Sequence, residues 1–445
     1  MVKPISLTVL FVVLVGCGGR DRPPETPVRP VTPALEQTIQ RVERGLLPPV
    51  VFRGQPGMTL GERMYHYRVP GVSIAVINHY AIEWARGYGT AEIGADRPVG
   101  VDTLFQAASV SKPVAALGAM VLVQRGWLAL DEDVNRKLTS WSVPDSALTR
   151  ARPVTLRGLL SHSAGVTVHG FNGYGEDESV PSLTELLAGG RPANSAPILV
   201  DLAPATKVRY SGGGYCIVQQ LMEDVADDAF EDVMEETVLS PLTMVHSTYR
   251  QPLPDDRHED AAAGHTAQGS VIPGRWRTYP EMAAAGLWTT ASDLAHFGIE
   301  LQRARAGLST RVLHPQAAAQ MLSRQLENVG LGIFIGGKDL STERFVHNGA
   351  NAGFRSMLVV YASGKGAVIL TNGDNGGELT SEILRGIAKE YGWSGSYYRE
   401  KAPGSAALPA AVERGPHAEH EDPGAPGSDH GLPGSDLPEA LASWK

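Results

Sequence analysis

A chain of 445 residues with 42% hydrophobic and 7% aromatic side chains is long enough to bury one large core or two smaller ones. Its formal net charge of −9 and isoelectric point near 5.8 give no basic footprint, which argues against nucleic acid and anionic lipid head groups as partners. Contact with a membrane therefore requires another feature of the sequence.

The N-terminus predicts an export signal. Lys3 precedes an apolar run over residues 5–15 that is too short to span a membrane as a helix. The run ends in Val15, Gly16 and Cys17, which resembles the bacterial lipobox, whose cysteine is lipidated and becomes the mature N-terminus. We expect residues 1–17 to be a lipoprotein signal peptide, with Cys17 anchoring an exported bacterial protein to a membrane of the cell envelope. A plain secretory signal with an incidental cysteine is the alternative.

The next segments predict a linker and the start of a folded domain. Residues 18–33 are rich in Arg, Asp and Pro and predict a linker. Apolar residues at helical spacing from Leu35 to Leu46 predict an amphipathic helix. Runs at 72–77 and 82–88 predict two strands joined in a hairpin around Asn78 and His79.

The other end of the domain predicts similar elements. Strands are expected at 345–347, 354–361 and 367–370, followed by a helix at 378–391. Between the two ends the patterns are mostly helical, as at 114–124, 183–187 and 215–226.

These patterns predict an α/β (α+β) fold, with an antiparallel sheet flanked by N- and C-terminal helices and an inserted, mostly helical domain. The α/β part is expected at about 34–111 and 326–400, and the helical part at about 112–325. Residues 401–445 are rich in Pro and Gly and predict a disordered tail.

Ser109 is the candidate nucleophile. Among the lysines of the chain, only Lys112 has a serine three positions earlier. Pro113 fits a helix only in its first turn, which places Ser109 at the N-terminus of a helix that runs to Arg125. The Lys112 amine can then reach the Ser109 hydroxyl and, when burial keeps it neutral, accept the hydroxyl proton. A capped helix with a surface lysine is the alternative, which the apolar surroundings of this helix disfavour.

Two later segments carry further candidates. Tyr210, before Ser211 and a glycine run, could relay a proton to a leaving group, although a lone tyrosine before a loop is usually a packing residue. His347 stands near the end of a predicted strand, and a lone histidine is also more often structural. The backbone N–H of Ala350, paired with that of Ser109, could form an oxyanion hole.

In this order and at these wide spacings, the three segments resemble the penicillin-recognising serine enzymes. This serine β-lactamase-like or penicillin-binding protein family includes class C β-lactamases, DD-peptidases and related esterases. The segments at 159–165 and 286–294 also look like this family, so that the resemblance covers about residues 36–392. We interpret these two segments as fold markers and His162 within the first as structural.

The resemblance implies a role for each matched residue. Ser109 would be the nucleophile, Lys112 its activating base and Tyr210 the proton relay, while His347 stands where the family usually has lysine. Substrate-binding or oxyanion positions would be Ser109, Gly212, Gly349 and Ala350.

Two departures from the family pattern affect the expected activity. Gly212 replaces the usual asparagine and so removes an amide that helps to hold substrate. His347 replaces lysine and is expected to give only a weaker, pH-dependent positive charge for a substrate carboxylate. We expect a serine hydrolase that forms an acyl-enzyme with an ester, a D-amino-acid peptide or a β-lactam, with esterase or peptidase activity favoured over efficient β-lactamase activity. A catalytically weak penicillin-binding or sensor lipoprotein is the alternative.

Other hydrolase classes have less support. The chain contains no Gly-x-Ser-x-Gly elbow of an α/β-hydrolase; the nearest match surrounds Ser73, inside a predicted strand. The run from His258 to Asp260 lacks a second histidine at helical spacing, so no metal and no cofactor are expected. The expected partners are a small-molecule or peptide substrate and a membrane, reached through the lipid anchor, and the expected state is a monomer. The sequence does not identify the substrate.

Overall fold

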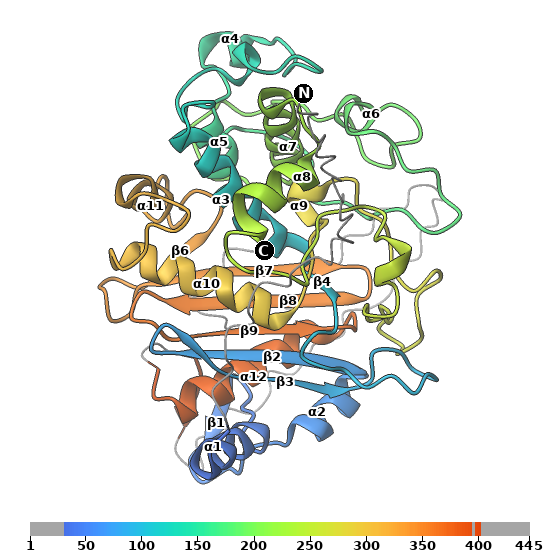
Figure 1. Ribbon diagram of the computed structural model, residues 1–445, viewed down its shortest axis with the longest axis vertical. Helices are drawn as coiled ribbons and strands as arrows, with labels where there is room; N and C mark the ends of the chain where they lie inside the picture. The colour runs from blue at the N-terminus through green and yellow to red at the C-terminus, as the bar shows by residue number, and fades with distance from the viewer. Residues whose placement is uncertain (1–30, 394–396, 402–445) are drawn as a thin grey trace, which may run out of the picture.

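A six-stranded antiparallel sheet lies at the centre of the protein (Figure 1). The computed structural model describes residues 31–393 and 397–401, so the expected signal peptide with Cys17 and the tail from residue 402 lie outside the described residues. In sheet order the strands are β3 (Ala81–Gly89), β2 (Gly71–Asn78), β9 (Gly366–Thr371), β8 (Phe354–Tyr361), β7 (Arg344–Asn351) and β6 (Phe334–Gly336). Since β2 pairs with β9, both ends of the domain contribute to one sheet, which confirms the expected fold.

The β2–β3 hairpin shows how the local sequence sets this sheet. His79 and Tyr80 connect the strands and both have positive φ angles, 52° and 60°, as the two central residues of a type I′ turn do. Side chains alternate between the two faces of β2. Ile74 and Val76 belong to one core, whereas Ala75 and Ile77 belong to the other. The sheet therefore separates two hydrophobic cores.

Helices cover both faces of the sheet. On one side, α12 (Gly376–Glu390) packs on β8 and β9 and also contacts α1 (Pro33–Glu43) and α2 (Leu60–Tyr67). On the other side, α10 (Ala291–Arg305) packs on β2, β3, β8 and β9. The sequence assigned α10 to the helical part of the chain, and this was wrong, because its apolar side chains bury against the sheet.

A largely helical region lies beyond α10, above the sheet in Figure 1. Its main helices are α3 (Ser111–Gln124) and α7 (Gly212–Ala226), which pack against each other. The shorter helices around them are α4 (Ala147–Ala151), α5 (Leu156–Leu160), α6 (Leu183–Ala188), α8 (Phe230–Met234), α9 (Met282–Ala285) and α11 (Pro315–Met321). Short single-turn segments are η1 (Ala108–Val110), η2 (Val134–Arg136), η3 (Glu235–Leu239) and η4 (Asp255–Arg257).

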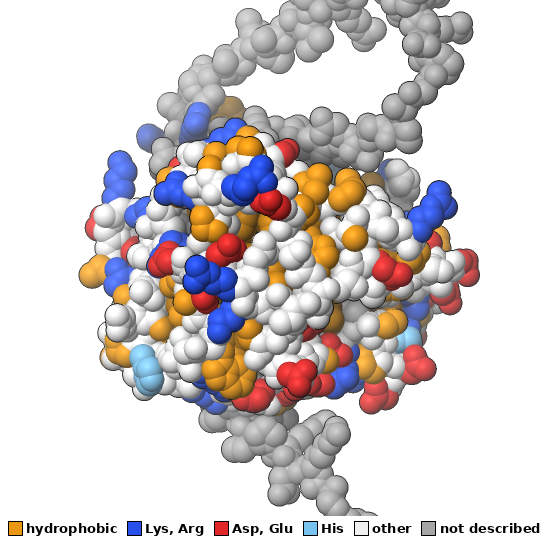
Figure 2. Space-filling view, turned by 90° about the horizontal axis from the view of Figure 1, so that it is seen from above, with side chains coloured by type: hydrophobic (Ala, Val, Ile, Leu, Met, Phe, Trp, Pro, Cys, Tyr) orange, Lys and Arg blue, Asp and Glu red, His pale blue; other side chains and the backbone are white. Residues whose placement is uncertain are grey.

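Two small strand pairs complete the fold. They are β1 (Val50–Phe52) with β10 (Arg399–Lys401), which run parallel, and β4 (Phe105–Gln106) with β5 (Trp288–Thr289), which run antiparallel. Within residues 31–393 and 397–401, no helix is both long and apolar enough to cross a membrane. Seen from the helical end, basic and acidic side chains are interspersed and hydrophobic ones form small patches (Figure 2).

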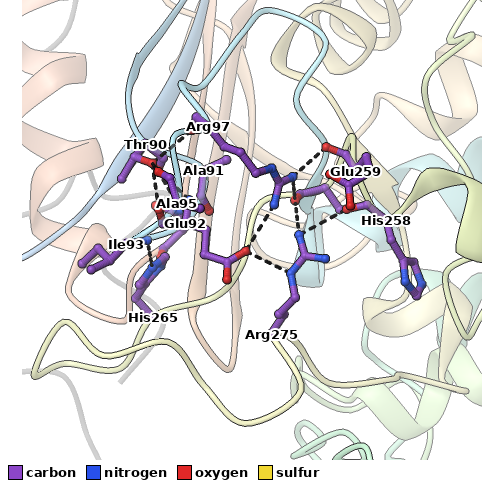
Figure 3. Close-up of polar contacts among 12 residues, drawn as sticks. Thr90, Ala91, Glu92, Ile93, Ala95, Arg97, His258, Glu259, His265 and Arg275 are labelled. Atoms are coloured by element: carbon purple, nitrogen blue, oxygen red, sulfur yellow. Dashed lines mark hydrogen bonds and ion pairs between the residues drawn. The ribbon is translucent and has the colours of Figure 1, made fainter.

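A polar network joins the end of β3 to the connection before α9 (Figure 3). The Glu92 carboxylate lies 3.2 Å from both Arg97 and Arg275. These two guanidinium groups also donate to the backbone carbonyls of Glu259 and His258, at 2.6 and 3.2 Å respectively. The His258–Glu259 pair, considered above as a metal motif, thus contributes its carbonyl oxygens to the fold.

His265 lies on the other side of the same network (Figure 3). Its Nδ1 donates to the Asn372 carbonyl at 2.8 Å and its Nε2 accepts the Ile93 N–H at 3.2 Å. Burial lowers the pKa of His265, so the neutral ring can act as donor and acceptor at once. The network fixes the segment after β3 to the sheet.

Replacing a buried isoleucine of α12 tests how much the sheet depends on this helix. Ile383 is 0% exposed, and Ile383→Ala should lower the free energy of unfolding by about 2–5 kcal/mol because it leaves a cavity. Ile93→Ala is the matched control, since Ile93 is 50% exposed, and should change stability by less than about 1 kcal/mol. Denaturant unfolding measures both, and equal losses would contradict the assignment of α12 to the core.

Candidate active site

Ser109 lies in the short turn η1, directly before α3. The preceding Ala108 has a φ of 49°, a left-handed conformation that is uncommon for a residue with a side chain and is often found at functional sites. Ser111 stabilises the turn, because its hydroxyl donates to the Ala108 carbonyl at 2.6 Å and accepts the Leu287 N–H at 3.0 Å. Ser109 itself is half-buried.

Lys112 is buried against Ser109. Its side chain extends back along α3, and Nζ lies 3.0 Å from Ser109 Oγ and 2.8 Å from the Ala284 carbonyl oxygen, to which it donates. Because the residue is only 2% exposed, burial lowers the pKa of Lys112 to about 7. A neutral amine in this position can still donate to Ala284 and can accept the proton of the Ser109 hydroxyl.

Tyr210 comes from the turn before α7 and reaches the same two residues. Its ring centre lies 4.9 Å from Lys112 Nζ. Burial raises the pKa of Tyr210, and hydrogen bonding with the Ser109 side chain opposes part of this rise. The phenol is therefore protonated at neutral pH and can donate its proton.

Two histidine rings pack on Tyr210. The ring centres of His162 and His169 lie 4.4 and 4.9 Å from that of Tyr210. His162 is buried, and its Nδ1 accepts the Ser211 N–H at 3.2 Å while its carbonyl accepts the Arg209 N–H at 2.8 Å. His162 thus fixes the backbone on both sides of Tyr210, which is the structural position expected for it.

His347 lies on β7 with its ring 6.3 Å from that of Tyr210. Nδ1 donates to the Asn348 carbonyl at 2.8 Å, which leaves Nε2 as the acceptor nitrogen. Burial and the neighbouring Lys112 lower the pKa of His347 to about 3. Burial thus favours the neutral form of His347, in contrast to the partial positive charge that the sequence led us to expect near neutral pH.

Gly349 brings β7 against the nucleophile turn. A Cβ atom at Gly349 would lie 2.3 Å from the Ala107 carbonyl oxygen, so a larger residue cannot occupy this position without displacing the backbone. The Ser356 hydroxyl, on the neighbouring strand, donates to the same carbonyl at 2.6 Å. Ala350 follows on β7 and is exposed. The backbone after Gly349 therefore runs beside the segment that carries Ser109.

Gly212 occupies a different environment from the one expected. It is buried, and its N–H already donates to the His169 carbonyl at 2.9 Å. A Cβ atom there would lie 2.9 Å from the Phe171 ring and 3.1 Å from the His169 carbonyl oxygen. The expected substrate-binding role of Gly212 was therefore wrong, because the 169–171 segment fills the space in front of it. The same packing explains why a glycine stands at this position.

Two contributors to the site carry no recognisable sequence signal. The Ala284 carbonyl holds Lys112, but a backbone oxygen cannot be identified from residue type. His169 lies in a loop whose shape the sequence does not reveal. Elsewhere in the described ranges, no group of three or more His, Cys, Asp and Glu side chains could hold a metal ion, and Cys216 is a buried free thiol.

Comparison with known proteins agrees with this arrangement. Residues 58–390 match the model of the Beta-lactamase family. The chain belongs to the β-lactamase family. Members of this family are serine hydrolases, and the chain is a serine hydrolase in this general sense. The sequence-based recognition of the family is thereby confirmed.

Several relatives illustrate the range of the family. Penicillin-binding protein 4 of Amycolatopsis lactamdurans is 27% identical over 343 residues, 73% of this chain and 86% of its own. Esterase EstB of Burkholderia gladioli is 41% identical, but only over 99 residues, 22% of this chain and 25% of its own. Among solved structures, the octameric penicillin-binding protein homologue from Pyrococcus abyssi has a TM-score of 0.62 at 23% identity, over 75% of this chain and 76% of its own. This structural likeness shows the fold.

Two glycines of α7 allow the packing around Gly212 to be tested. Gly212→Ala should lower the free energy of unfolding by about 1–3 kcal/mol, because the new methyl group displaces Phe171 or the His169 backbone. At Gly214 a Cβ atom would meet its nearest neighbour at 3.6 Å, an ordinary contact. Gly214→Ala should therefore be neutral or stabilise the helix by up to about 1 kcal/mol. Thermal unfolding compares the two variants, and equal stability would contradict the described position of the 169–171 segment.

Proposed function

We propose that this protein hydrolyses uncharged esters through an acyl-enzyme intermediate on Ser109. The observation that carries the proposal is the buried contact of 3.0 Å between Lys112 Nζ and Ser109 Oγ, in a site whose histidines are neutral. The contact provides an activated nucleophile, and the neutral surroundings favour a substrate without charge.

Acylation begins when the Ser109 oxygen attacks the carbonyl carbon of the ester. Neutral Lys112 takes the hydroxyl proton, while the developing oxyanion accepts hydrogen bonds from the N–H groups of Ser109 and Ala350. When the carbon–oxygen bond to the alcohol breaks, the phenol of Tyr210 gives its proton to the leaving oxygen. The proton held on Lys112 then passes to Tyr210, so both groups return to their starting states.

Water completes the reaction. The same base removes a proton from a water molecule that attacks the acyl carbon, and Ser109 leaves with that proton. The carboxylic acid product then dissociates. Deacylation thus uses Lys112 again as the base, and Ser109, the nucleophile of the first step, becomes the leaving group.

The charges around the site favour an ester over a substrate with a carboxylate. His347, at the position where the family usually has lysine, is neutral and its Nε2 is an acceptor. Arg209 and Arg355, which flank the site segments, are each paired with an aspartate, Asp201 and Asp374. A β-lactam or peptide carboxylate would therefore be desolvated without a cationic partner from these residues. The partial similarity to an esterase also supports the proposal.

Removing the hydroxyl of Ser109 tests the nucleophile. Ser109→Ala should reduce kcat/KM on 4-nitrophenyl butyrate by about 10³-fold or more, since no covalent intermediate can form. Ser73→Ala is the control, because Ser73 is a buried serine of β2 at the nearest match to an α/β-hydrolase elbow, and should keep its activity. Wild-type protein should turn over a chromogenic cephalosporin much more slowly than the ester. Retained esterase activity in Ser109→Ala would overturn the proposal.

The pH dependence of the reaction tests Lys112. Below about pH 7 the amine is protonated and cannot accept the Ser109 proton, so kcat/KM should rise with pH and level off above an apparent pKa near 7. Because burial raises the pKa of Tyr210 above its ordinary value of 10.0, no decline should follow below about pH 10. A profile on 4-nitrophenyl butyrate measures this, with Lys112→Arg as an inactive control. A flat profile between about pH 5 and 9 would contradict the assignment of Lys112 as the base.

A further inference from the structure

A cleft of about 370 Å³ opens at His169, a neighbour of Tyr210. Two chain segments line it, residues 167–172 and 194–196. His169 belongs to the lining, and its ring also packs on Tyr210 with a centroid distance of 4.9 Å. His169 thus belongs both to the wall of the cleft and to the surroundings of the group that would protonate a leaving alcohol.

The two walls of the cleft are fixed to each other. The Thr167 hydroxyl accepts the Leu199 N–H at 2.8 Å, and the Thr167 N–H donates to the Leu199 carbonyl at 2.8 Å. The Asn194 side-chain amide also donates to the carbonyl of Gly173, which directly follows the first lining segment, at 3.0 Å. The cleft is therefore largely formed before any ligand binds.

The cleft is also fixed to the N-terminus of α7, directly after Tyr210. The Ser211 hydroxyl donates to the Thr167 carbonyl at 2.6 Å, and the N–H of Gly213 donates to the Val168 carbonyl at 3.0 Å. Together with the bond from Gly212 to His169, these contacts hold the 167–169 backbone on the N-terminus of α7. A group bound in the cleft would thus have a defined position relative to Tyr210.

The chemistry of the lining favours an uncharged, ring-bearing group. His169 and Phe171 provide aromatic surface, and no Lys, Arg, Asp or Glu is among the lining residues. Ser195 also lines the cleft, and its buried hydroxyl has no hydrogen-bond partner among the described residues.

We propose that the cleft binds the alcohol portion of the ester substrate, with His169, which lines the cleft and packs on Tyr210, as a specificity-determining residue. The proposal rests on the esterase function proposed above and adds the class of alcohol, which is bulky, uncharged and ring-bearing. Tyr210 would protonate the leaving oxygen while the rest of the alcohol remains in the cleft. The departing alcohol and the acyl group on Ser109 then occupy different parts of the site.

Two esters with the same acyl group and similar alcohols test this inference. Ethyl butyrate and 2-phenylethyl butyrate differ by one ring in the alcohol, so the ratio of their kcat/KM values reports binding of that ring. Wild-type protein should prefer the phenylethyl ester. Ala196→Trp fills the cleft and should lower this preference by about tenfold or more. Ala203→Trp is the matched control, because Ala203 is an exposed alanine of the same region outside the cleft, and should leave the ratio unchanged.

Variants of His169 provide a second measurement if Ala196→Trp does not fold. His169→Ala removes the ring from the cleft wall and should also lower the preference for the phenylethyl ester. His169→Phe keeps an aromatic ring in that position and should restore it. A loss of activity that is equal for both esters would indicate a general structural role of His169 and would contradict the inference.

The outcomes separate the two proposals. Wild-type turnover of neither ester, or turnover that survives in Ser109→Ala, would overturn the esterase function and this inference with it. Ser109-dependent turnover of both esters with an unchanged ratio in Ala196→Trp would overturn only the role of the cleft. A reduced ratio in Ala196→Trp with an unchanged ratio in Ala203→Trp would support both.

Discussion

The burial of one amine, that of Lys112, between the Ser109 hydroxyl and the Ala284 carbonyl is the constraint on which the site depends. Burying an ammonium ion away from water costs free energy. Here this desolvation cost is reduced because the amine loses its proton near neutral pH. Such burial requires α3 to be covered by its neighbours, which are α7, α8, α9 and α11 of the helical region and the nucleophile turn η1. The packing of the whole helical region therefore sets the basicity of one side chain.

The same amine influences its neighbours. His162, His169 and His347 surround Tyr210, and in each the pKa is lowered first by burial and then by the nearby Lys112. The rings therefore act as neutral packing and hydrogen-bonding groups. The result is a site with basic groups in its composition but little positive charge at neutral pH. This condition suits a neutral substrate better than an anionic one and connects the position of Lys112 to the choice of substrate.

Local spacing allowed the sequence to predict the Ser109–Lys112 contact, because three residues of helix bring the two side chains together. The hairpin was also predicted, from two strand-like runs joined by a short turn. The sequence could not predict the neutrality of His347 or the burial of Gly212, since both depend on residues far away in the chain. It also assigned α10 to the wrong part of the fold, because an apolar helix face does not reveal which layer covers it. The three-residue strand β6 was too short to produce a pattern.

Gly349 illustrates how the fold keeps the spacing around the nucleophile constant when side chains elsewhere in the site change. Its missing side chain lets β7 run against Ala107 with backbone facing backbone, so the spacing between the strand and the nucleophile turn is set by main-chain atoms. Substitutions of side chains elsewhere leave such a spacing largely intact. At the exposed positions of the segments around the cleft, residue size is not restricted by main-chain contacts of this kind. A chain built in this way can exchange one substrate for another by surface substitutions while its acyl-transfer geometry stays the same.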